Sequence, residues 1–350
     1  MAAHHYRTDS RGCTVVASSF EGKFADGNYM DVSTSDAAAV PPSAAGFWRR
    51  LAAFIVDCLV LAAIGVLAGV VLADVFVRMG GYARLLGFFI ALAYFGVMNS
   101  GRCGGQTLGK RLLGLRVVGK HGALLTLPQS LLRYSVLGVP FFLNGAQIGG
   151  VTSTPLNYVL SLLIFGGTLA ILYLYVFNRQ GRRSLHDLVV GSSVVMAQCP
   201  VAAVRPMPVK RVHLIVVAVL MAAAAALPAF TGQLAESDDH KDMLVAHNAI
   251  TAVPGVQSAM VVHNTTLGTP NVESVIVRVN LSERRIEDNA LAERLAKLVL
   301  ANDRKAAAMS AIQVTMIYGY DLGIASSWSS RSYQFTAKAL QAPDRVGARR

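Results

Sequence analysis

Long apolar stretches constrain this chain more than any other feature, because about 20 consecutive apolar residues suffice to cross the hydrocarbon core of a bilayer. Three stretches reach that length: residues 51–73, with the single charge Asp57, residues 156–177, with none, and residues 212–230. Only 15% of the residues are charged, against about 25% in soluble domains. The sequence therefore predicts a multi-pass membrane protein whose membrane part is an all-α helical bundle.

Two further apolar stretches are weaker. Residues 82–98 are short, and Arg84 near their start can extend its side chain to the interface, so we predict a fourth span there. Residues 131–148 contain Arg133, Pro140 and Asn144 and fit either a fifth span or an interfacial helix. Their status decides whether the chain crosses the membrane five times or four.

The net charge of +12 is concentrated in the apolar part, since residues 1–231 carry 19 basic and 8 acidic side chains and residues 232–350 carry 13 and 12. A basic balance can indicate nucleic-acid binding. Interleaved with apolar runs it indicates topology instead, because short cytoplasmic loops are enriched in Lys and Arg. The basic groups lie before residue 51 and in residues 99–128 and 178–211. Five spans place all three on the cytoplasmic side, against anionic lipid headgroups, and leave the C-terminal domain extracytoplasmic.

Residues 1–45 lack the continuous apolar run of a signal peptide and are rich in Ala, Ser and Asp. We predict a disordered cytoplasmic tail that ends near Pro41-Pro42. The four cysteines, Cys13, Cys58, Cys103 and Cys199, show no metal-ligand spacing. The sequence thus gives no reason to expect a disulfide framework, a metal or a cofactor.

Arg50 and Asp57 stand seven residues apart, which on a helix is close to two turns and places both on one face. An ionisable group inside a span is costly and points to a functional site. Asp57 fits two roles equally well, either a hydrogen bond that fixes helix packing or the handling of a proton or cation.

The loop at residues 104–111 has the glycine and lysine spacing of a nucleotide-binding P-loop through Gly104, Gly109 and Lys110. Arg111 stands where Ser or Thr would bind magnesium, and no βαβ unit surrounds the loop. We therefore exclude nucleotide binding, and we predict a short cytoplasmic strand and turn over residues 112–118. His186-Asp187 in residues 181–191 also fails as a catalytic pair, because no nucleophile motif accompanies it.

Taken together, these segments resemble the RDD family of multi-pass membrane proteins, named for one Arg and two Asp. The resemblance runs from residues 46–53 to Asp57, through residues 105–114, to residues 184–187, and covers about residues 46–197. The family signature maps onto Arg50, Asp57 and Asp187, and Ser192 departs from it because the family usually has Thr there. The cytoplasmic loop motif comprises Gly105, Thr107, Gly109, Lys110, Arg111 and His186. The resemblance implies a bacterial inner-membrane location and a presumed transport role, linked in some members to sodium or proton exchange.

The C-terminal third reads as a small soluble α+β domain, sandwich-like, in residues 232–340, after a linker and final span in residues 201–231. A helix from residue 238 to about 252, strands at 256–263 and 272–281, a helix through Ile286 to Val299 and a strand at 311–320 predict a small sheet covered by helices on one side. His240, His247 and His263 have no diagnostic ligand beside them, so we expect no metal there. Residues 341–350 are predicted to be a flexible tail.

Two function classes remain open. In the first, a transporter of a small ion or solute, Asp57 shuttles a proton or cation, Arg50 favours its ionised form, and Asp187 lies at the cytoplasmic mouth. In the second, a membrane anchor or assembly scaffold, the outer domain engages a protein partner. No enzymatic activity is expected in either.

Overall fold

The computed structural model describes residues 5–8, 14–17, 45–145, 154–179, 182–198, 208–235, 238–266 and 272–341. The chain forms two compact units: Met1–Leu61, Phe89–Phe141 and Leu162–Ala224 in the first, and Ala62–Phe88, Phe142–Ser161 and Ala225–Arg350 in the second. Because both units draw on several stretches, they differ from the linear domain boundaries, which stay a prediction.

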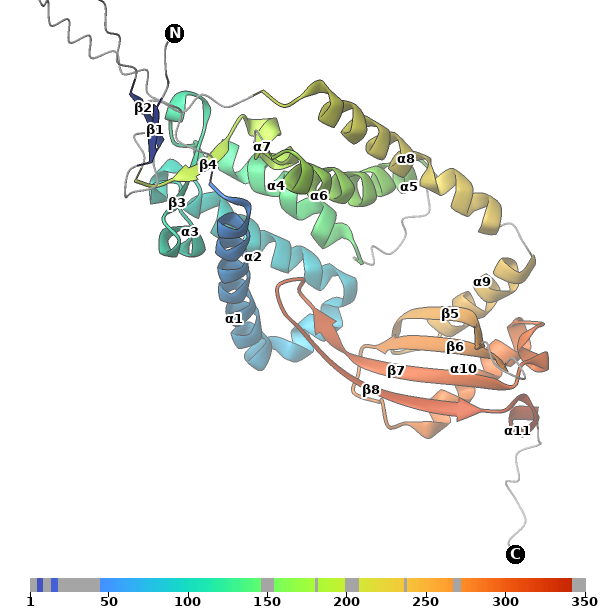
Figure 1. The fold of residues 1–350 in the computed structure, drawn as a ribbon. Helices are drawn as coiled ribbons and strands as arrows, with labels where there is room; N and C mark the ends of the chain where they lie inside the picture. Colours follow the sequence, from blue (N-terminus) through green and yellow to red (C-terminus); the bar gives the residue numbers. More distant parts are fainter. Residues whose placement is uncertain are drawn as a thin grey trace, which may run out of the picture. The chain divides into compact units, whose positions relative to one another are not determined.

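Three helical segments are long and apolar enough to cross a membrane: Phe47–Met98, Pro155–Phe177 and Arg211–Thr231. The first contains two helices, α1 (Phe47–Met79) and α2 (Ala83–Met98), joined by the 3-10 turn η1 (Gly80–Tyr82) (Figure 1). The third lies in α8 (Arg211–Ala235). The predicted apolar helices are thereby confirmed.

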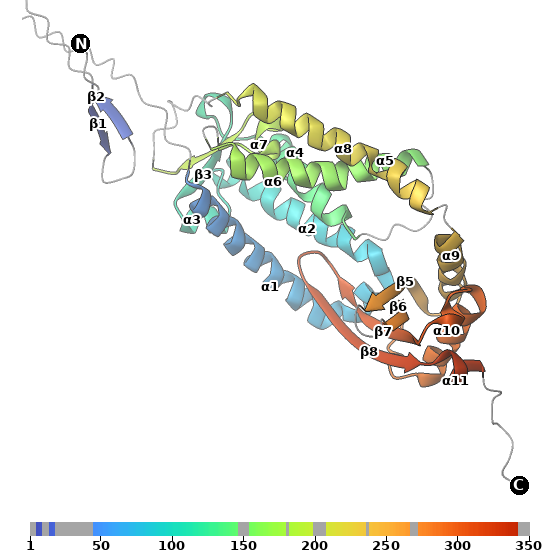
Figure 2. The same cartoon turned by 45° about the vertical axis from the view of Figure 1, so that its right-hand side comes forward.

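The weaker stretch around Arg133 forms α4 (Leu127–Leu143) and contains Pro140; residues 146–148 of the predicted element lie outside the described part. The next segment is interrupted, with α5 (Thr154–Ser161), a π-helical turn η4 (Leu162–Gly166) and α6 (Gly167–Phe177). A Cβ at Gly167 would lie 2.8 Å from Pro140 Cγ, and one at Gly166 3.0 Å from Met221 Sδ. The glycines therefore let α6 pack closely against α4 and α8, which run beside it in both views (Figure 2).

Two short helices precede a two-stranded sheet. Helix α3 (Leu108–Leu112) leads into β3 (Leu115–Val118), and α7 (Leu185–Val190) leads into β4 (Ser193–Met196). The strands pair antiparallel, with Val117 opposite Val194. The predicted strand over residues 112–118 is shorter than expected, because α3 ends at Leu112 and a turn with the left-handed Gly114 follows it, and α3 and β4 were not predicted.

These two elements repeat one another in sequence. Residues 107–118 read TLGKRLLGLRVV and residues 184–195 read SLHDLVVGSSVV. Thr107 and Ser184 are the N-cap residues, and Gly114 and Gly191 both adopt left-handed backbone, at φ of 61° and 70°. Aligned in this way, Val117 and Val194 are counterparts, and they also face each other in the sheet. Each half of residues 47–196 thus holds two apolar helical segments, a capped short helix, a left-handed glycine and a strand.

The C-terminal sheet has the order β5-β6-β7-β8, with β6 and β7 parallel and the other pairs antiparallel. The strands are β5 (Val256–Thr266), β6 (Val272–Leu281), β7 (Ala311–Asp321) and β8 (Ser326–Phe335). The last helix, α11 (Ala337–Gln341), follows β8. The predicted sheet is confirmed, but β8 and α11 were missed. Strand β8 reads SSWSSRSYQF, and its serines and exposed positions conceal the apolar alternation typical of a strand.

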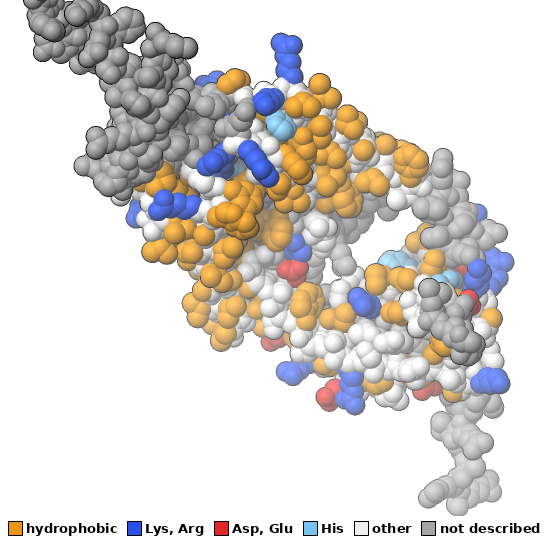
Figure 3. All heavy atoms as spheres, in the orientation of Figure 1, with side chains coloured by type: hydrophobic (Ala, Val, Ile, Leu, Met, Phe, Trp, Pro, Cys, Tyr) orange, Lys and Arg blue, Asp and Glu red, His pale blue; other side chains and the backbone are white. Residues whose placement is uncertain are grey.

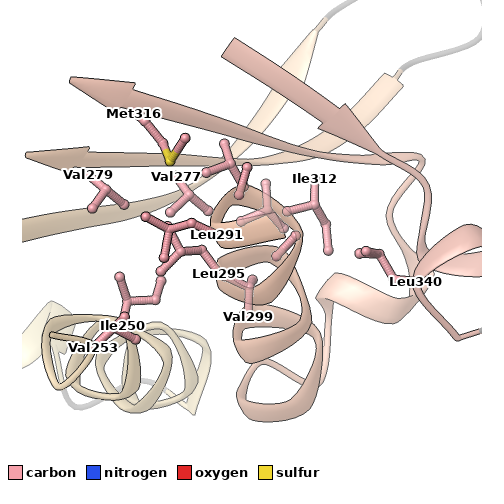
Figure 4. Close-up of a cluster of buried hydrophobic side chains, with 14 of the residues drawn as sticks. Ile250, Val253, Val277, Val279, Leu291, Leu295, Val299, Ile312, Met316 and Leu340 are labelled. Atoms are coloured by element: carbon pink, nitrogen blue, oxygen red, sulfur yellow. The ribbon is translucent and has the colours of Figure 1, made fainter. Parts of the chain in front are cut away.

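Helices α9 (Asp238–Thr251) and α10 (Asn289–Asn302) cover one face of this sheet, as predicted (Figure 4). Ile250 of α9 and Leu295 of α10 are fully buried beside Val277 and Met316 of the strands. Because the core closes between these elements, the C-terminal domain has a hydrophobic core of its own.

Large apolar side chains remain exposed on the helices, where hydrophobic atoms cover much of the visible surface (Figure 3). In α1, Leu67, Val70 and Val71 are 70%, 79% and 79% exposed. Water-exposed helices do not carry such continuous apolar surface, whereas lipid-facing helices do. In the predicted N-terminal tail, β1 (His5–Thr8) pairs antiparallel with β2 (Thr14–Ala17), which the sequence analysis did not predict. The remaining residues up to 44 lie outside the described part.

Candidate functional site

Asp57 is completely buried in α1 and accepts three hydrogen bonds. Its Oδ1 receives the Tyr94 hydroxyl and the Gly109 backbone N–H, both at 2.8 Å, and its Oδ2 receives the Thr107 hydroxyl at 2.5 Å. Thr107 also caps α3 by accepting the backbone N–H of Lys110 at 3.3 Å. The carboxylate therefore lies at the N-terminal end of a helix, where unpaired N–H groups and the dipole favour a negative charge.

Close contact between α3 and α1 requires the glycines of the loop motif. A Cβ at Gly109 would lie 2.1 Å from the Ala53 carbonyl oxygen. A Cβ at Gly105, where φ is +71°, would lie 2.5 Å from the Val117 carbonyl oxygen. The glycines of this P-loop-like spacing thus allow α3 to pack against α1, where Asp57 accepts a hydrogen bond from the backbone N–H of Gly109.

Asp187 is also completely buried and holds two arginines from different helices. Arg50 Nη2 of α1 lies 2.9 Å from its Oδ2, and Arg133 Nη2 of α4 lies 2.7 Å from its Oδ1. Ser192 Oγ donates to the same Oδ1 at 2.9 Å, and the hydroxyl that a threonine would supply is therefore present. Burial raises the pKa of Asp187, but Arg133, His186 and Arg50 outweigh it and lower that pKa well below its usual value. Asp187 is therefore an anion that links α1, α4 and α7.

His186 is 6% exposed, and its Nε2 lies 3.6 Å from Asp187 Oδ2. Its Nδ1 is buried without a hydrogen-bond partner among the described residues. Burial lowers the pKa of His186 to about 3, with Arg133, Arg50 and Lys110 acting in the same direction and Asp187 acting against them. The imidazole is therefore neutral near pH 7.

Lys110 projects from α3 between these two carboxylates without an ion pair among the described residues. Its Nζ lies 3.4 Å from Thr107 Oγ1 and 5.9 Å from the centre of the Phe95 ring. Burial first, and then the charge of Arg133, lower the pKa of Lys110 to about 7, although Asp57 acts in the opposite direction. Near neutral pH this amine therefore titrates.

A cavity of about 370 Å³ lies beside these groups. Both repeats line it: α1, α2, α3 and β3 from the first, and α4, α6, α7 and β4 from the second. Most of its wall is apolar, and apart from the hydroxyls of Tyr134 and Tyr175 its polar side chains are basic: Arg50, Lys110, Arg133 and His186. Neither buried carboxylate is among the lining residues.

The two repeats place their acidic and basic side chains on opposite elements. In the first, a long helix carries the acid Asp57 and the short helix carries the base Lys110. In the second, a long helix carries the base Arg133 and the short helix carries the acid Asp187, the sequence counterpart of Lys110. Each short helix is thus contacted by a buried charged side chain from a long helix of its own repeat, and α7 is also contacted by Arg50 of the first repeat.

Some of the predicted site residues belong to the buried contacts around the cavity, and others lie at the surface. Arg50 and Asp57 share a helix as predicted, but Arg50 does not pair with Asp57: its recorded partners are Asp187, the Arg182 carbonyl oxygen and the Tyr175 ring. The two side chains, seven residues apart on α1, contact different short helices: Arg50 contacts α7 and Asp57 contacts α3. Arg111 is exposed, with Nη2 donating to the Cys103 carbonyl oxygen at 3.3 Å, and is not part of the cavity.

Arg133, Tyr94 and Ser192 are the contacts that the sequence analysis did not assign. Arg133 carried a signal, because a charged side chain in an apolar stretch usually has a buried partner. Tyr94 carried none, since an aromatic residue in a span is common. No group of three or more metal-ligating side chains occurs among the described residues, and the side chain of His240 lies outside that part.

Residues 44–191 match the family model described as RDD family. The matched segment includes both repeats up to the left-handed Gly191, and with them Arg50, Asp57 and Asp187. No curated protein matches the chain.

Proposed function

Because residues 44–191 form an RDD-family domain, we propose that this membrane protein is a transport unit that binds a small solute in the cavity between its two repeats. The observation that carries this proposal is the cavity wall, to which each repeat contributes a long helix, a short helix and a strand. Membrane transporters built from internal repeats commonly bind their substrate at the interface between the repeats.

We further propose five spans. At one end of α4, Ser130 Oγ donates to the Phe95 carbonyl oxygen near the end of α2, at 3.4 Å. At the other end, the Phe142 carbonyl oxygen accepts Arg84 Nε near the start of α2, at 3.2 Å. Since α4 runs antiparallel along α2 over most of its length, it crosses wherever α2 crosses. This supports a spanning rather than an interfacial α4.

An odd number of spans places the C-terminal domain opposite the cytoplasmic N-terminus. The contacts of this domain support that side, because they reach the connection between α1 and α2: Tyr318 Oη donates to Asp74 Oδ1 at 2.7 Å, and Gln257 Nε2 donates to the Val77 carbonyl oxygen at 2.6 Å. Reporter fusions after residues 148, 178 and 232 test the topology. We expect the first and third outside and the second inside.

The buried carboxylates take a supporting role in this proposal. Asp57 has all its hydrogen bonds within the protein, and Asp187 is neutralised by two arginines. The titrating group at the cavity is Lys110, which makes it the candidate for coupling to protons. This changes the expected carrier of the proton from Asp57 to Lys110.

Two-sided access to the cavity is the measurement that separates a transporter from an anchor, and it requires no knowledge of the substrate. In a chain whose four native cysteines are replaced, Leu137→Cys puts a thiol in the cavity wall. A transporter should expose it to a membrane-impermeant thiol reagent from both faces in turn, in right-side-out and inverted vesicles. Arg111→Cys should react only from the cytoplasmic face, and Trp328→Cys only from the other face. Labelling of Leu137→Cys from one face only would rule out transport through this cavity.

The anchor or scaffold alternative is supported by one observation in the C-terminal domain. The sheet face opposite α9 and α10 presents Met260, Val262 and Trp328, which are 45%, 40% and 50% exposed. A protein partner would fit such a face. A photoreactive residue at Trp328 should then give one saturable crosslinked product in intact cells, and the same residue at exposed Arg304 should give none.

A further inference from the structure

We propose that the solute is a small amphipathic anion, whose carboxylate or phosphate head lies against Lys110 and His186 and whose apolar body fills the rest of the cavity. This inference rests on the proposed function, because it names the class of ligand for the same cavity. Nothing in the RDD resemblance requires an anion.

The charge of the wall favours a negative ligand. Arg50, Lys110 and Arg133 line the cavity. Asp187 is shared by the two arginines, so this group of three carries one positive charge in excess. Asp57 accepts only neutral donors, and no carboxylate lies within salt-bridge distance of Lys110 among the described residues. A protonated Lys110 therefore faces the cavity beside an arginine pair that is incompletely neutralised.

His186 supplies a second polar group with an unmet hydrogen bond. Its Nδ1 is buried without a hydrogen-bond partner in the part of the chain that the structure describes, and His186 is one of the residues that line the cavity. An unpaired buried polar atom costs free energy comparable to a lost hydrogen bond. A hydrogen bond from Nδ1–H to an anionic oxygen would satisfy this atom, and it requires the Nε2 lone pair to face Asp187 Oδ2 at 3.6 Å, beyond hydrogen-bond distance.

The size and remaining lining of the cavity limit the ligand. A volume of about 370 Å³ is near the lower end for small-molecule sites, which favours a single short chain over a two-chain phospholipid. Phe54, Phe95, Leu137 and Ile171 face it with apolar side chains. The site thus combines one basic end with an apolar chamber.

Lys110 also predicts how binding depends on pH. The charged groups around it are Asp57 and Arg50 from α1, Arg133 from α4, and Asp187 from α7, next to neutral His186. Together with burial they hold the pKa of Lys110 at about 7. A bound anion favours the protonated amine, so binding takes up a proton and weakens as the pH rises above 7.

Decanoate is the probe for the test, with the full chain in nanodiscs of zwitterionic phosphatidylcholine and binding measured by equilibrium dialysis at pH 6.5 and 8.5. Empty nanodiscs correct for partition into lipid. Lys110→Met should weaken binding by about tenfold or more, because a charged hydrogen bond is lost. The neighbouring surface variant Arg111→Met should bind as wild type does. Lys110→Arg should bind decanoate with little difference between the two pH values.

Two further measurements protect the test against misfolding and assign the ligand class. Leu137→Phe narrows the apolar end, and it should reject decanoate while still binding hexanoate. Decylammonium should not compete with decanoate. Equal binding by wild type and Lys110→Met, or competition by decylammonium as strong as by unlabelled decanoate, would overturn the anion proposal. The thiol-labelling experiment would be unaffected by that result, because two-sided access to Leu137→Cys does not depend on ligand charge.

Discussion

Both buried carboxylates of the segment that matches the RDD family, Asp57 and Asp187, lie at the N-terminus of a short helix and accept their hydrogen bonds from groups within the protein. Asp57 receives neutral donors, whereas Asp187 receives two guanidinium groups. The difference matters for substitution, because an amide in place of either carboxylate presents an N–H donor to groups that are themselves donors.

Asp57→Asn should therefore lower the free energy of unfolding by about 1–3 kcal/mol, although it preserves shape and volume. The new amide retains one acceptor for three donors, so at least one of Tyr94, Thr107 and Gly109 loses its partner. Unfolding in detergent followed by circular dichroism measures the change. Cys58→Ala, at the next and exposed position of α1, should stay within about 0.5 kcal/mol. Equal stability of the two variants would show that the Asp57 hydrogen bonds contribute nothing.

His186 should make the protein less stable as the pH falls from 6.5 towards 5. The pKa of a histidine is about 6.5 in an unfolded chain and about 3 for His186 in the folded one. In that range the unfolded chain binds the additional proton, so the free energy of unfolding falls by up to about 1.4 kcal/mol per pH unit. The pKa of Asp187 is lowered on folding, so its contribution is fully present above about pH 4 and is lost below it.

Unfolding curves between pH 6 and pH 5 separate His186 from the other two shifted groups, because Asp187 titrates at lower pH and Lys110, with a pKa of about 7, is protonated there in both states. His186→Gln should flatten the pH dependence in this range. A His186→Gln protein with the full wild-type slope would mean that another group binds the proton.

The sequence was sufficient to select Arg50 and Asp57, because an ionisable group in an apolar segment is costly and points to a functional site, whereas Asp187 was selected only by the resemblance to the RDD family. It was insufficient to pair them. Helical spacing places Arg50 and Asp57 on one face, yet each side chain bonds to a different short helix, and those helices come together only in the folded domain. Arg133 was regarded as a mark against a span, when its charge indicated the missing partner of Asp187.

At the scale of elements, the internal repeat explains why the two short helices and their strands form one structure. Each N-cap hydroxyl, each left-handed glycine and each valine pair has a counterpart. The apolar helices could be predicted from length and composition alone, because the bilayer sets their length. The repeat could have been found by aligning residues 107–118 with 184–195, whereas β8 could not, since its residues lack apolar alternation.

Gly109→Ala should disrupt the contact of α3 with α1 more than an equal change elsewhere in the loop. The added Cβ meets the Ala53 carbonyl oxygen at 2.1 Å, and backbone cannot move aside as a flexible side chain would. We expect a loss near the upper end of the range for overpacking, about 3 kcal/mol, with greater exchange of the β3 amides in hydrogen exchange. Gly101→Ala is the matched control, because its nearest contact is an ordinary 3.6 Å. Similar losses for both variants would place the effect in the loop backbone and not in the helix contact.

At the scale of the whole molecule, the second unit joins the ends of α1 and α2 to the C-terminal sheet by an apolar cluster that includes Phe76 and Tyr320, and by a few polar contacts. Arg84 Nη1 lies 2.6 Å from Oδ2 of Asp321, the last residue of β7, while its Nε donates to the Phe142 carbonyl oxygen at the end of α4. The core of the C-terminal domain, around Ile250, Leu295 and Met316, does not include these residues. Holding the domain in place and folding the domain therefore depend on different side chains.

Arg84→Met should consequently loosen the β7–β8 turn without unfolding the C-terminal domain. The turn loses a partly buried ion pair, since the Arg84 and Asp321 side chains are 14% and 31% exposed. In hydrogen exchange of the full chain, amides of residues 318–325 should exchange faster, and those of β6 and α10 should keep their wild-type protection. Arg285→Met removes a surface ion pair with Asp288 in the same domain, where such pairs contribute about 0–1 kcal/mol, and it should change neither region. Faster exchange throughout the sheet in Arg84→Met would show instead that the domain depends on the membrane helices for its stability.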